Sequence, residues 1–264
     1  DAIHVANATC PANGTAPCDD DGHGTHTAGT FAGGDGGSNQ IGVAPGAKWI
    51  GCRNMNAGNG TPASYIECMQ WMMAPTDLAG NNPDPDLAPD IISNSWGCPV
   101  SEGCTVGNEL RQAVDNVTAA GILFVAAAGN DGPQCATVRD APATYDSALT
   151  IGATDVNDRL ASYSSRGPLT ANRLKTRTYQ SKVDLSAPGS NVRSAYSAAG
   201  YASLSGTSMA TPHVAGAAAL VMSAAPWLKG QPAKVMQLLN KTAQSTGVAN
   251  TLSQANQMCV RWTA

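Results

Sequence analysis

The sequence has few charged residues, few aromatic residues and no long uninterrupted hydrophobic run. Only 13% of its 264 residues are charged, and the formal net charge is −4, so we expect neither nucleic acid nor a membrane as a partner. The most apolar run, residues 214–225, is about 12 residues long, which is too short to span a bilayer and predicts a buried core helix. No basic segment followed by a hydrophobic stretch opens the sequence, so any secretion signal has been removed or lies outside these residues.

Cysteine pairs with the tight spacing of zinc ligands are also absent, although the sequence contains eight cysteines. Two pairs are close enough in sequence to close short disulfide loops, namely Cys10–Cys18 and Cys98–Cys104. The other four cysteines are Cys52, Cys68, Cys135 and Cys259. Because disulfides form in oxidising compartments, we expect a secreted, extracellular protein; buried thiols in a cytosolic protein are the alternative.

Short apolar segments alternate with segments of helical pattern along the chain. The predicted strands lie at 48–52, 90–94, 122–127, 148–153 and 183–186, and the predicted helices at 64–73, 106–120 and 208–225. This alternation favours the α/β class, with a parallel β-sheet flanked by helices on both faces. Glycine- and proline-rich stretches at 33–38 and 80–89 predict surface loops within one domain that covers residues 1–264.

Three separated motifs supply most of the groups that acyl transfer needs. His-Gly-Thr-His at 23–26 offers an imidazole base, Ala-Ala-Ala-Gly-Asn at 126–130 a side-chain amide, and Gly-Thr-Ser-Met-Ala-Thr-Pro at 206–212 a hydroxyl. Ser208 opens a helix, where backbone N–H groups and the helix dipole favour developing negative charge; a simple helix cap is the alternative. Asn130 follows a hydrophobic strand and could donate to an oxyanion, or could belong to an Asn-Asp-Gly turn.

His23 and His26 lie three residues apart, so they share one face of a predicted helix start. Together with the acidic run at 19–21 they could be drawn as a zinc or calcium site. A His-Glu-X-X-His motif and its glutamate base are absent, however. We therefore expect no metal and no cofactor, and we expect His213 to be a structural histidine.

Taken in order, and with the serine motif extended through His-Val-Ala-Gly, the three motifs resemble those of the subtilisin-like serine proteases, or subtilases. The resemblance covers about residues 19–225 and implies a doubly wound parallel sheet with the active site above the strand ends. It implies a serine endopeptidase that hydrolyses polypeptide substrates through an acyl-enzyme. Ser208 would be the nucleophile, His23 the general base and Asn130 the oxyanion donor.

The same resemblance assigns substrate-binding groups. It implies that Ser95, Trp96 and Gly97 form the strand that pairs with the substrate backbone. Ala127, Ala128 and Gly129 would form the facing wall of the primary specificity pocket. Asp140 would lie near the floor of that pocket, which implies a preference for Arg or Lys before the scissile bond; a hydrogen bond to its own loop is the alternative. A calcium loop of the family is matched only in shortened form at 38–43, so the metal site is not carried over.

The acidic member of the catalytic triad has no match in the sequence. In the family it ends a strand as Asp-Thr-Gly or Asp-Ser-Gly, some tens of residues before the histidine motif, and neither tripeptide occurs. Asp1, the acidic run at 19–21 and Asp184 are not assigned this role, and the peptidase domain is expected to be N-terminally incomplete. Three explanations are open: an upstream fragment supplies the strand and the acid, another chain or a rearranged segment fills the gap, or the chain is degenerate.

The missing acid sets the expected activity. Related triads lose roughly 10⁴-fold in turnover without their acid, so we expect weak or no peptidase activity from these residues alone. A catalytically impaired remnant that only binds peptides is the alternative function. A metallohydrolase, which a chelator would inactivate, is a third.

Overall fold

The computed structural model describes residues 2–3, 9–10, 18–77, 79–169, 182–196 and 200–244. Its central feature is a parallel sheet whose strands follow each other in chain order. These strands are β5 (Ile91–Asn94), β6 (Leu123–Ala127), β7 (Leu149–Thr154) and β8 (Leu185–Pro188). Every residue of β6 and β7 is buried, as expected for central strands covered on both faces.

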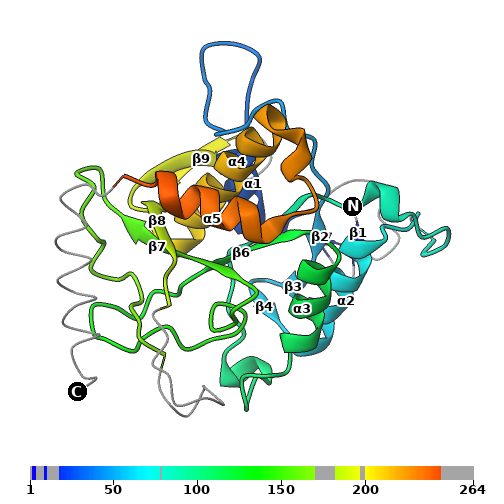
Figure 1. The fold of residues 1–264 in the computed structure, drawn as a ribbon, viewed down its shortest axis with the longest axis horizontal. Helices are drawn as coiled ribbons and strands as arrows, with labels where there is room; N and C mark the ends of the chain where they lie inside the picture. Colours follow the sequence, from blue (N-terminus) through cyan, green and yellow to red (C-terminus); the bar gives the residue numbers. More distant parts are fainter. Residues whose placement is uncertain are drawn as a thin grey trace.

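Helices cover the two faces of this sheet (Figure 1). On one side lie α4 (Thr207–Ala224) and α5 (Pro232–Thr242), with α1 (His23–Ala32) packed against α4. On the other side lie α2 (Pro62–Met73) and α3 (Arg111–Ala119). No helix in the described part of the chain is long and apolar enough to cross a membrane.

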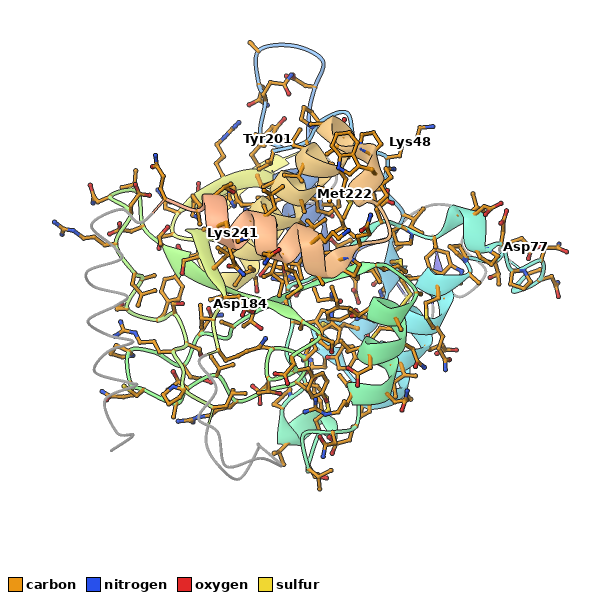
Figure 2. All side chains as sticks on the ribbon, in the orientation of Figure 1. Lys48, Asp77, Asp184, Tyr201, Met222 and Lys241 are labelled. Carbon is orange, nitrogen blue, oxygen red and sulfur yellow. A yellow bond between two sulfur atoms is a disulfide. The ribbon has the colours of Figure 1, made fainter. Side chains whose placement is uncertain are left out.

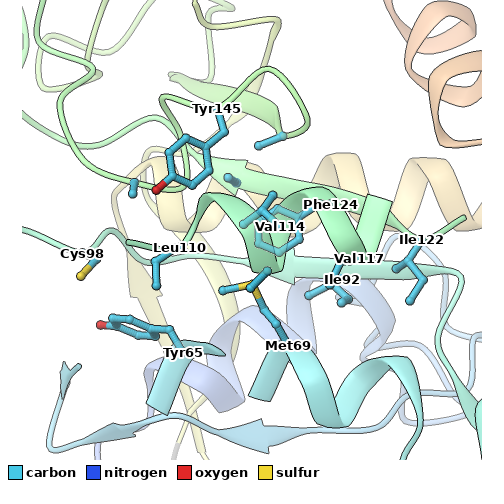
Figure 3. Close-up of a cluster of buried hydrophobic side chains, with 14 of the residues drawn as sticks. Tyr65, Met69, Ile92, Cys98, Leu110, Val114, Val117, Ile122, Phe124 and Tyr145 are labelled. Atoms are coloured by element: carbon cyan, nitrogen blue, oxygen red, sulfur yellow. The ribbon is translucent and has the colours of Figure 1, made fainter. Parts of the chain in front are cut away.

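The alternation of side chains along β6 divides the core between these two layers. Leu123 and Val125 pack with apolar residues of α4, among them Ala218 and Met222. Phe124 points the other way, into the cluster formed with α2 and α3 that Figure 3 shows. Because successive strand residues face opposite sides of a sheet, one apolar strand holds both helix layers in place.

The remaining strands are short and lie outside this sheet. β1 (Ala2–Ile3) pairs in parallel with β2 (Cys52–Arg53), while β3 (Met55–Asn56) and β4 (Asn59–Gly60) form an antiparallel hairpin. A second hairpin consists of β9 (Val192–Tyr196) and β10 (Gly200–Leu204). Short 3₁₀ turns occur at η1 (Pro85–Leu87), η2 (Val100–Glu102) and η4 (Pro226–Leu228).

The predicted α/β class with a parallel sheet is confirmed. The strands expected at 90–94, 122–127, 148–153 and 183–186 are found as β5 to β8, and the helices expected at 64–73 and 208–225 as α2 and α4. The loop that contains 80–89 projects from the molecule near Asp77, as Figure 2 shows. The β9–β10 hairpin and α5 were not predicted.

Two predicted elements have wrong boundaries. Residues 48–51 are not assigned to a strand, and β2 begins only at Cys52. These residues line a cleft, and in the described part of the chain they join no β-ladder. The helix expected from 106 begins at Arg111. Before it, the Glu109 carboxylate accepts a hydrogen bond of 2.7 Å from the backbone N–H of Val106, which holds the chain in a turn.

Disulfides tie the described loops to the core. Cys10–Cys18 and Cys98–Cys104 are both formed, as the sequence spacing predicted. A third, Cys52–Cys68, joins β2 to α2. Cys135 is also disulfide-bonded, and Cys259 lies outside the described residues.

Candidate active site

His23 is the first residue of α1, and the chain just before it fixes where that helix begins. The Asp19 carboxylate accepts hydrogen bonds from the backbone N–H groups of Gly22 and Thr25, at 2.9 and 2.7 Å, and from the Thr25 hydroxyl at 2.6 Å. These bonds satisfy N–H groups that a helix start leaves without partners. Gly22 has φ +84°, and a Cβ there would lie 2.7 Å from the Tyr196 ring, so the turn into the helix requires glycine.

The electrostatic surroundings of His23 favour its neutral form. Burial lowers the pKa of the imidazole, the charge of Asp21 raises it, His26 lowers it and Asp19 raises it, with a net lowering. Burial alone would raise the pKa of Asp19, but its hydrogen bonds outweigh burial and lower that pKa, so Asp19 is held as a carboxylate that serves the helix start. Within the described ranges no carboxylate forms a hydrogen bond or ion pair with His23.

Ser208 lies in the first turn of α4, directly after Gly206 and Thr207. Its Oγ donates a 3.0 Å hydrogen bond to the carbonyl oxygen of Ser95, and the Ser95 Oγ donates to the Ser208 carbonyl at 2.8 Å. Ser95 directly follows β5, so this reciprocal pair attaches the start of α4 to the carboxyl end of the sheet. Ser208 and His23 both line one large cleft.

Asn130 is held by its side-chain oxygen. The Asn130 Oδ1 accepts from the backbone N–H of Thr207 at 2.9 Å and from the Thr207 Oγ1 at 3.2 Å. That hydroxyl oxygen in turn accepts from the backbone N–H of Gly129 at 3.2 Å. With Oδ1 occupied, the Nδ2 group is the end of the amide available to a new acceptor. Thr207 was missed at the sequence level, although its hydroxyl next to the presumed nucleophile was a usable signal.

A pocket of about 220 Å³ lies beside Ser208. All the predicted substrate-binding residues line it: Ser95, Trp96, Gly97, Ala127, Ala128, Gly129 and Asp140. Asn130 lines it too, so the pocket brings together residues from the ends of β5 and β6. Its wall also contains Asp131 and Arg139, two charged residues that sequence reasoning did not single out.

The Trp96 indole is supported from behind by α2. It stacks on the ring of Tyr65, with centroids 4.0 Å apart and planes 5° apart. The Tyr65 hydroxyl donates to Glu102 at 2.6 Å, and the other Glu102 carboxylate oxygen accepts from the backbone N–H of Gly60 at 3.1 Å. Burial and this carboxylate raise the pKa of Tyr65, so the phenol remains a donor. The stack thus fixes one wall of the pocket.

The other two described histidines are engaged elsewhere. His26 is fully buried, and its Nε2 lies 3.0 and 3.1 Å from the carbonyl oxygens of Val192 and Ala202 on the β9–β10 hairpin. The Nδ1 of His213 lies 2.8 Å from the Met209 carbonyl oxygen, and burial lowers the pKa of this ring. The His26 Nε2 therefore faces the β9–β10 hairpin, whereas His23 lines the cleft.

The comparisons with known proteins agree with one another. The Subtilase family profile matches residues 4–256. Bacillopeptidase F of Bacillus subtilis (strain 168) is 40% identical over 217 residues, which are 79% of this chain but only 14% of that protein. Subtilisin Savinase of Lederbergia lenta is 39% identical over 234 residues, 88% of this chain and 74% of Savinase.

Solved structures give the same answer for the fold. A cold adapted subtilisin-like serine proteinase matches with a TM-score of 0.67 and 33% identity, covering 88% of this chain and 71% of its own. Sphericase matches with a TM-score of 0.70 and 31% identity, covering 92% of this chain and 76% of its own. With a parallel sheet, a serine at a helix start and a histidine on the same cleft, the chain belongs to the Subtilase family.

Proposed function

We propose that this chain is the peptidase domain of a secreted serine endopeptidase, with Ser208 as nucleophile, His23 as general base and Asn130 as oxyanion donor. One observation carries the proposal. Ser208 lines both the cleft that contains His23 and the pocket that contains Asn130. A carbonyl carbon placed beside the Ser208 hydroxyl therefore has a base on one side and an amide donor on the other. The disulfides accord with an extracellular location.

The chemistry would proceed in two halves. The Ser208 Oγ leaves the Ser95 carbonyl, gives its proton to His23 and bonds to the substrate carbonyl carbon. The resulting oxyanion accepts from the Asn130 Nδ2 and from backbone N–H groups at the start of α4. The intermediate collapses as His23 protonates the leaving amine, and water then hydrolyses the acyl-enzyme by the same steps. Polypeptides are the proposed substrates.

We also infer that the acid that orients His23 comes from an upstream fragment outside these 264 residues. The cleft beside His23 has room for such a fragment, and in the described ranges His23 has no carboxylate partner at hydrogen-bond distance. Without the acid we expect turnover to be roughly 10⁴-fold below that of a complete triad. Residues 1–264 would then form one peptidase domain that is completed by the added segment.

A fluorophosphonate probe tests this function, because it reacts with an activated serine even when turnover is slow. We expect the folded protein to be labelled and Ser208→Ala to abolish labelling. Ser205→Ala is the matched control: its Oγ accepts from the Asn191 N–H, and its loss should leave labelling intact. A protein that binds peptides but resists the probe would be the peptide-binding remnant, and inactivation by a chelator alone would indicate a metallohydrolase.

For the pocket we propose a preference for Arg or Lys before the scissile bond. Asp131 and Asp140 both line it and are opposed by Arg139 alone, so the charges of these residues sum to a negative value. The Asp140 side chain also packs against Gly97: a Cβ added to Gly97 would lie 3.1 Å from the Asp140 Cβ and 3.8 Å from its Oδ2.

Acylation by matched peptide phosphonates with Arg or Phe at that position measures this preference. We expect Arg to react faster, and Asp140→Asn to reduce the Arg-to-Phe ratio about tenfold, which corresponds to ~1.4 kcal/mol. Asp158→Asn, on an exposed loop, is the control and should leave the ratio unchanged. Equal rates for Arg and Phe in the unaltered protein would contradict the proposed preference.

A further inference from the structure

We propose that Ser165 is a positioning residue that sets the direction of the Asn130 carboxamide. It lines neither the pocket nor the cleft and acts through the backbone on both sides of Asn130. This inference deepens the proposed function and rests on it, because an oxyanion donor speeds the reaction most when its direction is fixed in advance. The fixing of the backbone can be measured separately from the reaction.

Two hydrogen bonds from Ser165 flank Asn130. The backbone N–H of Ser165 donates to the Gly129 carbonyl oxygen at 2.9 Å. The Ser165 Oγ accepts from the backbone N–H of Asp131 at 3.1 Å. One residue thus holds the peptide group immediately before Asn130 and the peptide group immediately after it.

These two bonds restrict both backbone rotations of Asn130. The Gly129 carbonyl belongs to the peptide plane that precedes the Asn130 Cα, and the Asp131 N–H belongs to the plane that follows it. Because peptide groups are planar, each residue has only two soft rotations, one toward each neighbouring plane. Holding both planes therefore sets the direction of the Asn130 Cα–Cβ bond, from which the carboxamide extends.

The far end of the Asn130 side chain is fixed separately. Its Oδ1 accepts from the backbone N–H and from the Oγ1 of Thr207. With the Cα–Cβ bond directed by Ser165 and the side-chain oxygen held by Thr207, the Nδ2 group keeps little freedom of its own. Donors that are preorganised in this way lower a barrier because they need no reorientation during the reaction.

Ser165 is itself held in place. It is buried, with 1% of its surface exposed, and it belongs to the segment that follows β7. The Gly132 N–H donates to the Tyr163 carbonyl oxygen at 2.8 Å, so this segment runs alongside the loop after β6. The Tyr163 hydroxyl donates to the Gly189 carbonyl oxygen at 2.8 Å, which also accepts from the Gly206 N–H. The segment is therefore connected to the turn before the proposed nucleophile as well.

The close approach of the two segments depends on glycine on either side of Asn130. Gly129 has φ +100°, and a Cβ there would lie 2.9 Å from the Ser165 Oγ. A Cβ at Gly132 would clash with the Ser164 carbonyl oxygen. Because glycine has no side chain, the backbone can come near enough for the Ser165 hydrogen bonds to form.

Phosphonylation of Ser208 by the peptide phosphonates measures the effect, because a phosphonyl oxygen stands in for the oxyanion. We expect Ser165→Ala to lower the limiting rate about tenfold, which is the order expected for one hydrogen bond. The half-saturating concentration of the reagent should not change, and Arg and Phe reagents should lose equally. A loss confined to the half-saturating concentration or to the Arg reagent would overturn the proposal, since Ser165 would then act on the pocket through Asp131.

Ser164→Ala is the matched control. Ser164 is the adjacent buried serine, but its Oγ accepts from the Ala153 N–H of β7 at 3.0 Å. Each variant removes one buried hydrogen bond, so we expect similar losses of stability in urea, whereas only Ser165→Ala should slow phosphonylation. Equal slowing by both variants would refute the proposal, because it would trace the loss to stability alone.

A double-mutant cycle with Asn130→Ala shows whether Ser165 acts through the carboxamide. Removal of one oxyanion donor costs about 10²–10³-fold in rate, and we expect Asn130→Ala to fall in this range. In that background Ser165→Ala should cause no further loss. Losses that multiply independently would exclude the positioning role.

The outcomes separate this inference from the proposed function. If Asn130→Ala leaves the rate unchanged, the oxyanion role of Asn130 is wrong and the positioning role is wrong with it. If Asn130→Ala slows the reaction and Ser165→Ala does not, only the positioning role is wrong. Hydrogen exchange read by NMR tests the backbone directly: the Asp131 amide should exchange faster in Ser165→Ala than in Ser164→Ala, and equal exchange would contradict the inference.

Discussion

At the scale of single residues, Thr207 connects the two halves of the site. Its hydroxyl accepts from the Gly129 N–H and donates to Asn130, so it fixes the amide that we propose as the oxyanion donor. Thr207→Val keeps the shape but removes both hydrogen bonds. A hydrogen bond contributes about 0.5–1.5 kcal/mol, so we expect the rate of Ser208 phosphonylation to fall about tenfold. Thr207→Ser, which keeps the hydroxyl, should retain most of the rate; equal losses in both variants would contradict this role.

The ionisation of His23 gives a second prediction at this scale. Because burial lowers its pKa below the ordinary value of 6.5, the neutral base persists to lower pH. We expect the phosphonylation rate to rise with pH with its midpoint below 6.5. A midpoint above 6.5 would contradict this prediction, because a nearby negative charge favours the protonated imidazole and would show that a carboxylate faces His23.

The lowered pKa also affects the free energy of unfolding. The folded protein favours the neutral imidazole, so this contribution to stability is fully present above pH 6.5 and is lost as the pH falls through the lowered pKa.

At the scale of elements, the contact between α4 and the chain that follows α1 depends on a glycine. A Cβ at Gly216 would lie 2.6 Å from the Val43 Cβ and 3.1 Å from the Phe31 carbonyl oxygen. Ala is the better helix former by about 1 kcal/mol, but overpacking of this kind costs about 1–3 kcal/mol. The balance of the two effects leads us to expect Gly216→Ala to lower the free energy of unfolding in urea by ~1 kcal/mol. Gly46→Ala, where a Cβ meets nothing within 4 Å, should not.

The elements also show what the sequence could predict. Central strand β6 is apolar throughout, and β7 is rich in apolar and β-branched residues, so local pattern alone identified them. Segment 48–51 also contains large apolar residues, Trp49 and Ile50, yet a strand needs a neighbouring strand, and the position of that neighbour is a tertiary property. The β9–β10 hairpin contacts residues that are distant in sequence: Arg193 of β9 donates to the Asn39 side chain, and the His26 Nε2 lies 3.0 Å from the Val192 carbonyl oxygen. Its own residues therefore gave little sign of it.

The site divides in the same way. The roles proposed for Ser208, His23 and Asn130 come from residue types in specific motifs of the sequence. The support of the site could not be predicted, because it comes from partners far away in sequence, as with Glu102 and Tyr65 behind Trp96. The charged residues Asp131 and Arg139 could not be assigned to the pocket wall from the sequence, because the folded loop after β6 places them there.

At the scale of the whole molecule, Cys52–Cys68 forms part of the wall of the cleft that contains His23. It spans 16 residues and joins β2 to α2. Loop-closure entropy predicts that its removal lowers the free energy of unfolding by about 3 kcal/mol. The Cys98–Cys104 loop spans 6 residues, so the same arithmetic gives about 2 kcal/mol. Paired Cys→Ser variants compared by urea denaturation measure both losses, and a larger loss for the shorter loop would contradict this entropic account.

The two hydrogen bonds between Ser95 and Ser208 have a consequence for how the protein meets a peptide. These residues are separated by 113 positions in the sequence. The two hydrogen bonds nevertheless join the proposed nucleophile directly to the segment that we expect to bind the substrate backbone. The distance between the substrate-binding segment and the Ser208 hydroxyl is therefore set before a peptide binds. A peptide that binds along 95–97 requires only that the Ser208 hydroxyl release its hydrogen bond to the Ser95 carbonyl oxygen.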